Sequence, residues 1–372
     1  MKAGWQRKKL ADVLKIQNGY AFDSKKFNSS KGMPLVRIRS LKLGIETETW
    51  FDGPYDDRYV VKAGDLLIGM DGEFGCFEWK GDPSLLNQRV CRLQDFTGAL
   101  IPKFLFYGVN DYLKAIEDVT GFTTVKHLSS KQVLDIDFPV PPLPEQHRIV
   151  TILDEAFDGI ATAKANAEKN LQNARALFES HLQSVFTGRG EGWVETTVDK
   201  ISTNLDSKRI PITKGVRKSG EYPYYGASGI VDYVADYIFD GDTLLISEDG
   251  ANLLARSTPI AFSASGKYWV NNHAHILKFE DMATQRFVEF YLASIRLDEY
   301  ITGAAQPKLN QKALNSIPIP IPVVVVEQAA IVGRIESLQD ETQRLESLYQ
   351  QKLTALDDLK KSLLHQAFSG NL

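Results

Sequence analysis

The sequence has little of what defines secreted and membrane proteins. Only two of its 372 residues are cysteines, Cys76 and Cys91, too few for a disulfide framework. No apolar run approaches the roughly 20 residues needed to cross a bilayer, and Met1–Trp5 lacks the apolar core of a signal peptide. We therefore expect a globular protein of the reducing cytoplasm, with no membrane contact.

Motifs for catalysis and cofactor binding are also missing. The chain has no Walker loop, no Gly-x-Gly-x-x-Gly phosphate loop and no Cys/His set with zinc spacing. It has no Asn-Pro-Pro-aromatic motif of adenine methyltransferases and no clear nuclease motif. His273 and His275 share one face of an expected strand but lack further ligands for a metal site. We expect no catalytic residue, metal or cofactor in this chain.

What the sequence does contain is an internal repeat at an offset near 182 residues. Gly4-Trp5 recurs as Gly192-Trp193, Leu66–Ile68 as Leu244–Ile246, Glu145-Gln146 as Glu327-Gln328, and Phe186-Thr-Gly188 as Phe368-Ser-Gly370. The repeat predicts modules at residues 1–144 and 189–326, and long helices at residues 145–188 and 327–372. The offset has no gap throughout the helices, which indicates spacers of fixed length.

Both helical segments carry an apolar seam with alternating steps of three and four residues, as in a coiled coil. The first seam comprises Ile149, Leu153, Ala156, Ile160, Ala163, Ala167, Ala174 and Leu177; the second comprises Ile331, Ile335, Leu338, Thr342, Leu345, Tyr349, Leu356, Leu359 and Leu363. Asn170 and Lys352 interrupt the seams at equivalent places and are expected to fix their register. About 40 helical residues span roughly 60 Å. We expect the helices to pack antiparallel, which would bring the chain termini close together.

The modules are predicted to be mixed α/β. Strands are expected at Leu35–Arg39, Asp65–Met70, Val90–Leu93, Thr243–Ser247 and His273–Phe279, and short helices at Lys103–Ile116 and Thr284–Ile301. The predicted fold class is therefore α+β, with two globular α/β domains separated by two long antiparallel coiled-coil helices in a pseudo-twofold repeat.

Basic residues cluster locally, although the net charge is −4. Lys208, Arg209, Lys214, Arg217 and Lys218 lie within eleven residues that contain no acid, and weaker groups are formed by Lys25, Lys26 and Lys31 and by Arg37 and Arg39. A phosphate backbone would contact such a local cluster, so the local charge matters more for binding than the net charge. The alternative is an ordinary solvated loop.

Three pairs of matched loops carry side chains that can contact bases. Asn and Gln pair bidentately with adenine, and Arg with guanine. The candidates are Asn87, Gln88 and Arg89 with Asn271, Asn272 and His273; Asp71 and Phe74 with Asp249 and Asn252; Thr123, Thr124, Lys126 and His127 with Gln306, Lys308 and Asn310; and the aromatic Tyr224 and Tyr225. Polar turn residues also occur for purely structural reasons. Different loops on one repeated framework would recognise two different sequences.

On these features the chain resembles the specificity subunits of type I restriction-modification systems, over essentially its whole length. The resemblance rests on the doubled module, on Pro141–Gln146 with its counterpart Glu327-Gln328, on the two Phe-Thr/Ser-Gly ends, and on Tyr222–Ile230 with Leu244–Gly250. Val323–Val326 depart from the family pattern at the second helix start.

The resemblance implies a function for each part of the chain. Each target recognition domain would recognise one half of a split duplex DNA sequence. The helices would set the spacing and dock methylation subunits, two of them by the twofold repeat. Those subunits would carry S-adenosylmethionine, and restriction subunits using ATP could join them.

Three other interpretations remain open. The chain could be the recognition subunit of a related type II enzyme. It could be a scaffold whose modules bind protein rather than DNA. The helices alone could also form a generic dimerising coiled coil.

Overall fold

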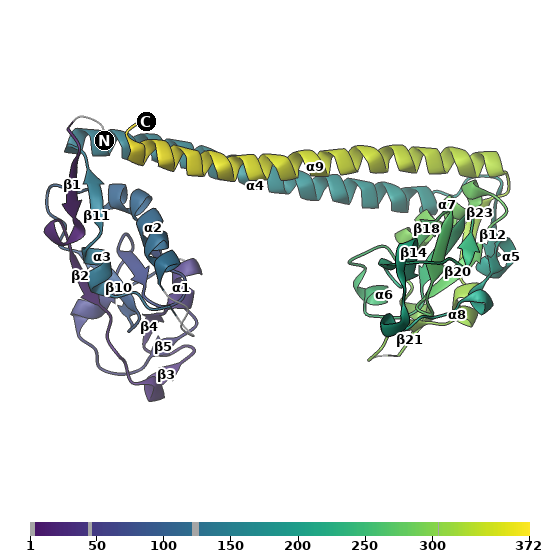
Figure 1. Cartoon of the computed structure of the whole chain (residues 1–372), viewed down its shortest axis with the longest axis horizontal. Helices are drawn as coiled ribbons and strands as arrows, with labels where there is room; N and C mark the ends of the chain where they lie inside the picture. Colours follow the sequence, from purple (N-terminus) through teal and green to yellow (C-terminus); the bar gives the residue numbers. More distant parts are fainter. Residues whose placement is uncertain (1–3, 44–46, 121–125, 304) are drawn as a thin grey trace. The chain divides into compact units, whose positions relative to one another are not determined.

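The computed structural model describes residues 4–43, 47–120, 126–303 and 305–372, which form two compact units (Figure 1). Unit 1 comprises Met1–Asn166 and Lys352–Leu372, and unit 2 comprises Ala167–Gln351. Two 45-residue helices, α4 (Leu143–Thr187) and α9 (Val325–Ser369), contribute to both units. The predicted long helices are confirmed, each starting two residues earlier than expected.

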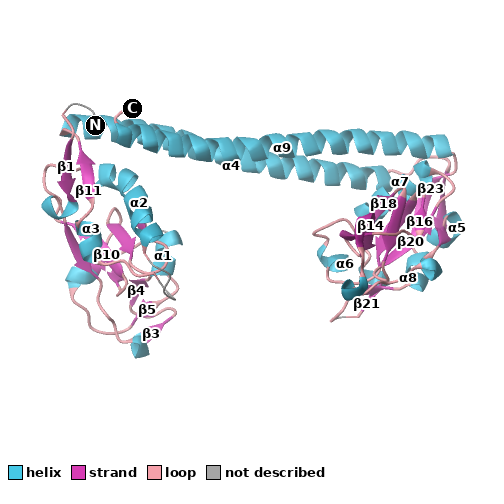
Figure 2. Cartoon of the chain, in the orientation of Figure 1, coloured by secondary structure: helices cyan, strands magenta, loops and turns pink. Residues whose placement is uncertain are grey.

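The module of unit 1 is built on an antiparallel four-stranded sheet (Figure 2). Its strand order is β2 (Lys15–Asn18), β10 (Val90–Gln94), β7 (Leu66–Gly69) and β8 (Gly75–Glu78). A five-stranded sheet has the order β3 (Phe27–Asn28), β5 (Trp50–Phe51), β4 (Met33–Val36), β9 (Ser84–Leu86) and β6 (Val60–Val61). The helices of the module are α1 (Ile38–Leu43), α2 (Pro102–Val119) and α3 (Ser130–Leu134).

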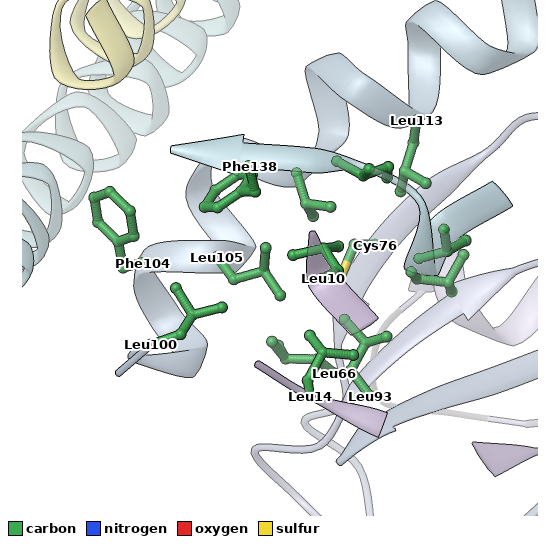
Figure 3. Close-up of a cluster of buried hydrophobic side chains, with 14 of the residues drawn as sticks. Leu10, Leu14, Leu66, Cys76, Leu93, Leu100, Phe104, Leu105, Leu113 and Phe138 are labelled. Atoms are coloured by element: carbon green, nitrogen blue, oxygen red, sulfur yellow. The ribbon is translucent and has the colours of Figure 1, made fainter. Parts of the chain in front are cut away.

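A two-stranded ladder closes this module at its chain ends. β1 (Gln6–Lys9) pairs antiparallel with β11 (Asp137–Val140), just before α4 begins. The apolar face of α2 supplies Phe104, Leu105 and Leu113 to the main core, where they meet Leu66 and Leu93 of the sheet and Phe138 of β11 (Figure 3). Sheet, helix and ladder therefore share one core.

The module of unit 2 repeats this plan. Its main sheet has the order β13 (Thr203–Asn204), β20 (Ala274–Lys278), β17 (Thr243–Ser247) and β18 (Ala261–Ala264), strand for strand the order of unit 1. Its closing ladder pairs β12 (Trp193–Thr197) with β23 (Pro318–Pro322). Its other elements are α5 (Val198–Ile201), α6 (Asn252–Ala255), α7 (Met282–Ser294), α8 (Gln311–Asn315), β14 (Ser219–Gly226), β15 (Gly229–Val234), β16 (Phe239–Asp240), β19 (Lys267–Val270), β21 (Ile301–Thr302) and β22 (Lys308–Leu309). The predicted α+β fold with an internal repeat is confirmed.

The repeated Glu-Gln pair has a structural reason. The Gln146 side chain is fully buried; it accepts a hydrogen bond from the Ile101 N–H and donates to the carbonyls of Ala99 and Pro141, each at 2.8 Å. Gln328 likewise donates to the Pro322 carbonyl and accepts from the Thr284 hydroxyl, both at 2.7 Å. In each unit one glutamine therefore joins the helix start to the module.

The repeated phenylalanines close the helix ends in the same way. Phe368 packs on Phe104, with ring centroids 5.0 Å apart, and Phe186 packs on Phe287 at 5.2 Å. Trp5 and Leu372 both contribute to the main core of unit 1, and Arg148 donates to the Leu372 carbonyl at 2.5 Å. The predicted closeness of the N-terminal and C-terminal segments is confirmed (Figure 1).

Within each unit the two helices run antiparallel. In unit 1, Arg148 contacts Leu372 while Lys164 pairs with Asp357, so the numbering rises on α4 as it falls on α9. In unit 2, Arg175 pairs with Glu346, and further along α4 Leu182 shares a core with Ile335 near the start of α9.

The predicted seam is wrong at several positions of its second half, although Ala174 is buried and Leu356 and Leu363 are partly buried as expected. Asn170 and Lys352 are exposed, whereas Leu171 and Leu353 are partly buried. Leu177 and Leu359, expected in the seam, are 62% and 46% exposed. A helix with 3.6 residues per turn drifts away from a strict seven-residue repeat, so the buried face moves by one residue along the helix. The interruption that was expected to fix the register does not exist.

Two predicted elements also need correction. The strand expected at Leu35–Arg39 ends at Val36, so Arg39 lies in helix α1. The helix expected at Thr284–Ile301 begins at Met282 and ends at Ser294, and Ile301 belongs to a short strand.

Candidate nucleic-acid interface

The same three segments meet at the end of a central strand in both units. In unit 1, the Met70 N–H donates to the Arg89 carbonyl at 2.9 Å and the Gly72 N–H donates to the Lys126 carbonyl at 3.0 Å. In unit 2, the Glu248 N–H donates to the His273 carbonyl at 2.9 Å and the Gly250 N–H donates to the Pro307 carbonyl at 3.0 Å. In each unit, the three loops predicted from the sequence are therefore brought together, and the backbone hydrogen bonds that join them are the same in both units, forming one repeated loop frame.

This frame presents different side chains in each unit. The unit 1 loop cluster consists of Asp71, Arg89 and His127: the Asp71 carboxylate hydrogen-bonds the His127 ring and lies 3.5 Å from Arg89 Nε. The unit 2 loop cluster consists of Asp249, His273 and Lys308: His273 Nδ1 lies 2.9 Å from the Asp249 carboxylate, and Lys308 forms an ion pair with Glu248 at 3.1 Å. Each cluster holds one aspartate beside two residues that can carry positive charge.

Arg89 differs from His273 in its backbone as well. Its φ is 73°, the left-handed region that costs free energy for a residue with a side chain, whereas His273 has no such conformation. Backbone strain of this kind persists only where the surroundings impose it, and it is concentrated at functional sites.

A hollow of about 350 Å³ adjoins the unit 1 loop cluster. Its lining residues are Arg37, Ile38, Arg39, Asp71, Asn87, Gln88 and Arg89. Three arginines face a single carboxylate there, so the hollow favours a ligand rich in hydrogen-bond acceptors or negative charge.

The structure leaves many of the other predicted residues on the surface. Exposed candidates are Lys25, Lys26, Lys31, Lys208, Lys214, Lys218, Asn272, Gln306 and Asn310, while Lys126, Tyr225 and Asn252 are half-buried. Asn310 caps helix α8, and Asn252 bonds the turn at Thr258, so their side chains already have structural roles. Thr123 and Thr124 lie outside the described residues.

The basic cluster of unit 2 is partly neutralised. Arg209 is held by Glu248 at 2.6 Å. Arg217 pairs with Asp232 at 3.1 Å, and its guanidinium lies 4.3 Å from the centre of the Tyr224 ring. Asp232 lies on β15 and Glu248 directly follows β17, so the absence of acids within the cluster's own sequence was misleading. Only the three lysines of this cluster are exposed for phosphate contact.

Three predicted contact residues are corrected: two aromatic residues because they pack into the interior, and Asn271 because its amide oxygen is already engaged. Phe74 is 6% exposed and Tyr224 is 1% exposed, and both pack into the interior. Asn271 is also buried, and its Oδ1 accepts a hydrogen bond from the His273 N–H at 2.7 Å. Aromatic and amide residues were expected on the surface because they can contact bases, but here they stabilise the loops from beneath.

Sequence reasoning missed a buried ionic network under the unit 2 loop cluster. His275 Nδ1 lies 2.5 Å from the Asp206 carboxylate, and its Nε2 lies 2.8 Å from the Leu309 carbonyl. Burial alone would raise the pKa of Asp206, but His275, the Ile276 N–H and Arg209 together hold it below its ordinary value of 3.8. The partners are some 70 residues apart in sequence, so no local pattern reveals them.

Asp206, Glu248 and His275 bring three ligand-type atoms within 4.8 Å of one another. The Arg209 guanidinium belongs to the same cluster and satisfies both carboxylates. A metal ion would have to displace this cation, so the geometry favours a structural network over a metal centre.

Comparisons with known proteins agree with this geometry. A family model described as the type I restriction modification DNA specificity domain matches residues 2–172 and 190–355. The chain belongs to this family. The resemblance stated from the sequence is confirmed, and the chain is a type I specificity subunit.

Individual relatives cover nearly the whole chain. The type I restriction enzyme EcoBI specificity subunit of Escherichia coli is 30% identical over 417 residues, covering 99% of this chain and 86% of the relative. The putative MjaX specificity subunit of Methanocaldococcus jannaschii is 22% identical and covers 99% of this chain and 93% of its own length.

Solved structures share the fold. A chain from a study of complex assembly and conformational transition of the type I R-M system has a TM-score of 0.75 at 17% identity, covering 100% of this chain and 99% of that one. The HsdS subunit from Thermoanaerobacter tengcongensis has a TM-score of 0.62 at 18% identity, covering 100% and 98%. Within the described residues, no helix is long and apolar enough to cross a membrane.

Proposed function

We propose that each module of this specificity subunit recognises one half of a bipartite duplex DNA target, and that the chain performs no chemistry itself. The observation that carries the proposal is the repeated loop frame, which presents Asp71, Arg89 and His127 in unit 1 and Asp249, His273 and Lys308 in unit 2. One frame with two different sets of polar side chains suits two different half-sites, because base edges are distinguished by their donors and acceptors.

Exposed lysines of the two modules would bind the phosphate backbone. Lys25, Lys26 and Lys31 serve unit 1, and Lys208, Lys214 and Lys218 serve unit 2. Such contacts supply affinity and orientation without sequence preference.

The chemistry would belong to partner subunits. We assign the S-adenosylmethionine to methylation subunits and ATP-dependent cleavage to restriction subunits. In this proposal the chain contributes recognition, docking and spacing, and its buried carboxylates serve the fold.

The exposed leucines of the long helices fit the docking of two methylation subunits. Leu177 and Leu359 occupy equivalent positions of the repeat, and both are large apolar side chains that remain exposed. In unit 2, Leu177 borders a groove of about 740 Å³ that is also lined by Trp193, Ile331 and Leu338. Equivalent sites take equivalent partners, so Leu177→Asp or Leu359→Asp should each remove one methylation subunit from the complex, as measured by native mass spectrometry.

The recognition proposal is tested in the full complex with its methylation partner. Sequencing of modified adenines in cells expressing the complex should reveal one split motif. Reversing Lys208, Lys214 and Lys218 to glutamate should weaken duplex binding and flatten its salt dependence, because log Kd changes by roughly 0.9 per phosphate contact for each tenfold change in salt. The exposed Lys278 and Lys312 of unit 2, reversed in the same way, serve as the control.

A complex that modified adenines without sequence preference would refute the proposal. Unchanged duplex binding by the triple reversal would favour the scaffold interpretation, in which the modules bind protein.

A further inference from the structure

The Asn87 side chain is buried and has no hydrogen-bond partner in the described part of the chain. It is 6% exposed, and no hydrogen bond reaches either end of its amide among the described residues; its Oδ1 lies beneath the surface with no donor. Buried amides are almost always paired, so an unpaired one points to a strained site or to an absent ligand.

The repeated fold does not require the amide at this position to be unpaired. Asn271 occupies the same place in unit 2, and there the amide oxygen accepts the His273 N–H at 2.7 Å. In unit 1 the residue that follows two positions later, Arg89, has a φ of 73°. The repeated frame can thus satisfy an asparagine at this position, and unit 1 leaves it unsatisfied.

Asn87 lines the hollow that Arg37, Arg39 and Arg89 also line, and its amide oxygen lies just beneath that surface. Arginine side chains only donate hydrogen bonds, so a ligand here must offer acceptors. The unpaired amide oxygen needs a donor in addition. Phosphate offers acceptors alone, whereas the edge of a base can offer both.

We propose that this hollow binds the major-groove edge of an adenine in the half-site of unit 1, with Asn87 as its specificity-determining residue. Adenine presents the N6 amino donor next to the N7 acceptor, which match the Oδ1 and Nδ2 of one amide; cytosine offers only the donor there and guanine only acceptors. The amide must turn about its χ2 bond to engage, and that torsion is soft. The inference rests on the proposed function, because it requires unit 1 to contact DNA.

The test is Asn87→Leu in the full complex, with modified adenines mapped by sequencing. Leucine has the branched shape and the same number of side-chain heavy atoms as asparagine, but it cannot pair with a base. One adenine in the unit 1 half-site should become degenerate, with discrimination falling by about tenfold or more, while the unit 2 half-site and the spacing are retained. The melting temperature should stay or rise, because the variant removes an unpaired buried polar group.

Asn271→Leu is the matched control. It removes a satisfied amide and should lower the melting temperature. An unchanged motif for Asn87→Leu, or a melting temperature that falls as in the control, would overturn the inference. An equal loss of binding to all sequences would mean a phosphate contact and would overturn it too. A wild-type complex with no motif would refute the proposed function instead.

Discussion

Lys164 on α4 and Asp357 on α9 form an ion pair at 2.7 Å, and the repeat relates this pair to the one between Arg175 and Glu346. At the offset of 182, Lys164 corresponds to Glu346 and Arg175 to Asp357. Both cations therefore lie on α4 and both anions on α9. The two helices are charge-complementary to each other and each would repel a copy of itself.

Charge reversal tests this complementarity. Changing Lys164 and Arg175 to glutamate should lower the melting temperature by a small amount, since exposed pairs contribute little individually. Reversing Glu346 and Asp357 to lysine in the same chain should restore it. Thermal unfolding at low and high salt measures the effect, and it should shrink at high salt because the charges are exposed. A quadruple variant less stable than the double variant would contradict the pairing.

Gly108 should not tolerate a side chain. A Cβ built on it would lie 2.3 Å from the Phe368 ring, in the core that joins α2 to the end of α9. Gly108→Ala should destabilise unit 1 by about 1–3 kcal/mol, the usual cost of overpacking, as measured by urea denaturation. Gly159→Ala on α4 meets nothing within 4 Å and should instead gain up to about 1 kcal/mol from helix propensity.

The Asp206 carboxylate should make unit 2 sensitive to acid. Its pKa lies below the ordinary 3.8, so its stabilisation is fully present above that value and is lost as the pH falls through the folded pKa. Asp206→Asn should cost about 1–3 kcal/mol at neutral pH, and this difference should shrink as the pH falls below about 4. Denaturant unfolding across pH measures it. The exposed Asp240→Asn is the control, and an equal effect there would refute the assignment.

Helix length should set the gap between half-sites. Lys164 faces Asp357, so four residues inserted beside each keep the two helices matched. The insertion lengthens the helix pair by about 6 Å. The number of unspecified base pairs between the two half-sites should therefore grow by about two. Sequencing of modified adenines measures the gap. An insertion beside Lys164 alone would mismatch the helices and should impair modification, whereas an unchanged gap for the matched insertion would show that the helices do not set the spacing.

The sequence revealed the large elements because they repeat. Gln146 and Gln328 are 182 residues apart because each must meet the same backbone groups at a helix start, and helices of fixed length preserve that offset. The sequence was less informative about which residues of α4 form its buried face. A strict seven-residue pattern placed Asn170 and Leu177 on that face, whereas the period of 3.6 residues per turn places Leu171 there instead.

The recognition surface was predictable in position but not in detail. The loops of Arg89 and His127 were identified, yet their meeting at Asp71 depends on strand pairing between distant segments. Arg209 and Arg217 were expected on the surface because their acidic partners lie 39 and 15 residues away. The unpaired state of Asn87 follows from packing, which no local pattern encodes.

The closing ladders β1–β11 and β12–β23 have a consequence for how such genes can change. Each module enters and leaves through a pair of hydrogen-bonded strands, so its two chain ends are fixed to each other before the helix begins. A stretch of coding sequence between these strands behaves as a cassette. Recombination could replace it with that of another family member and alter one half-site, while the helices and the other module keep their fold.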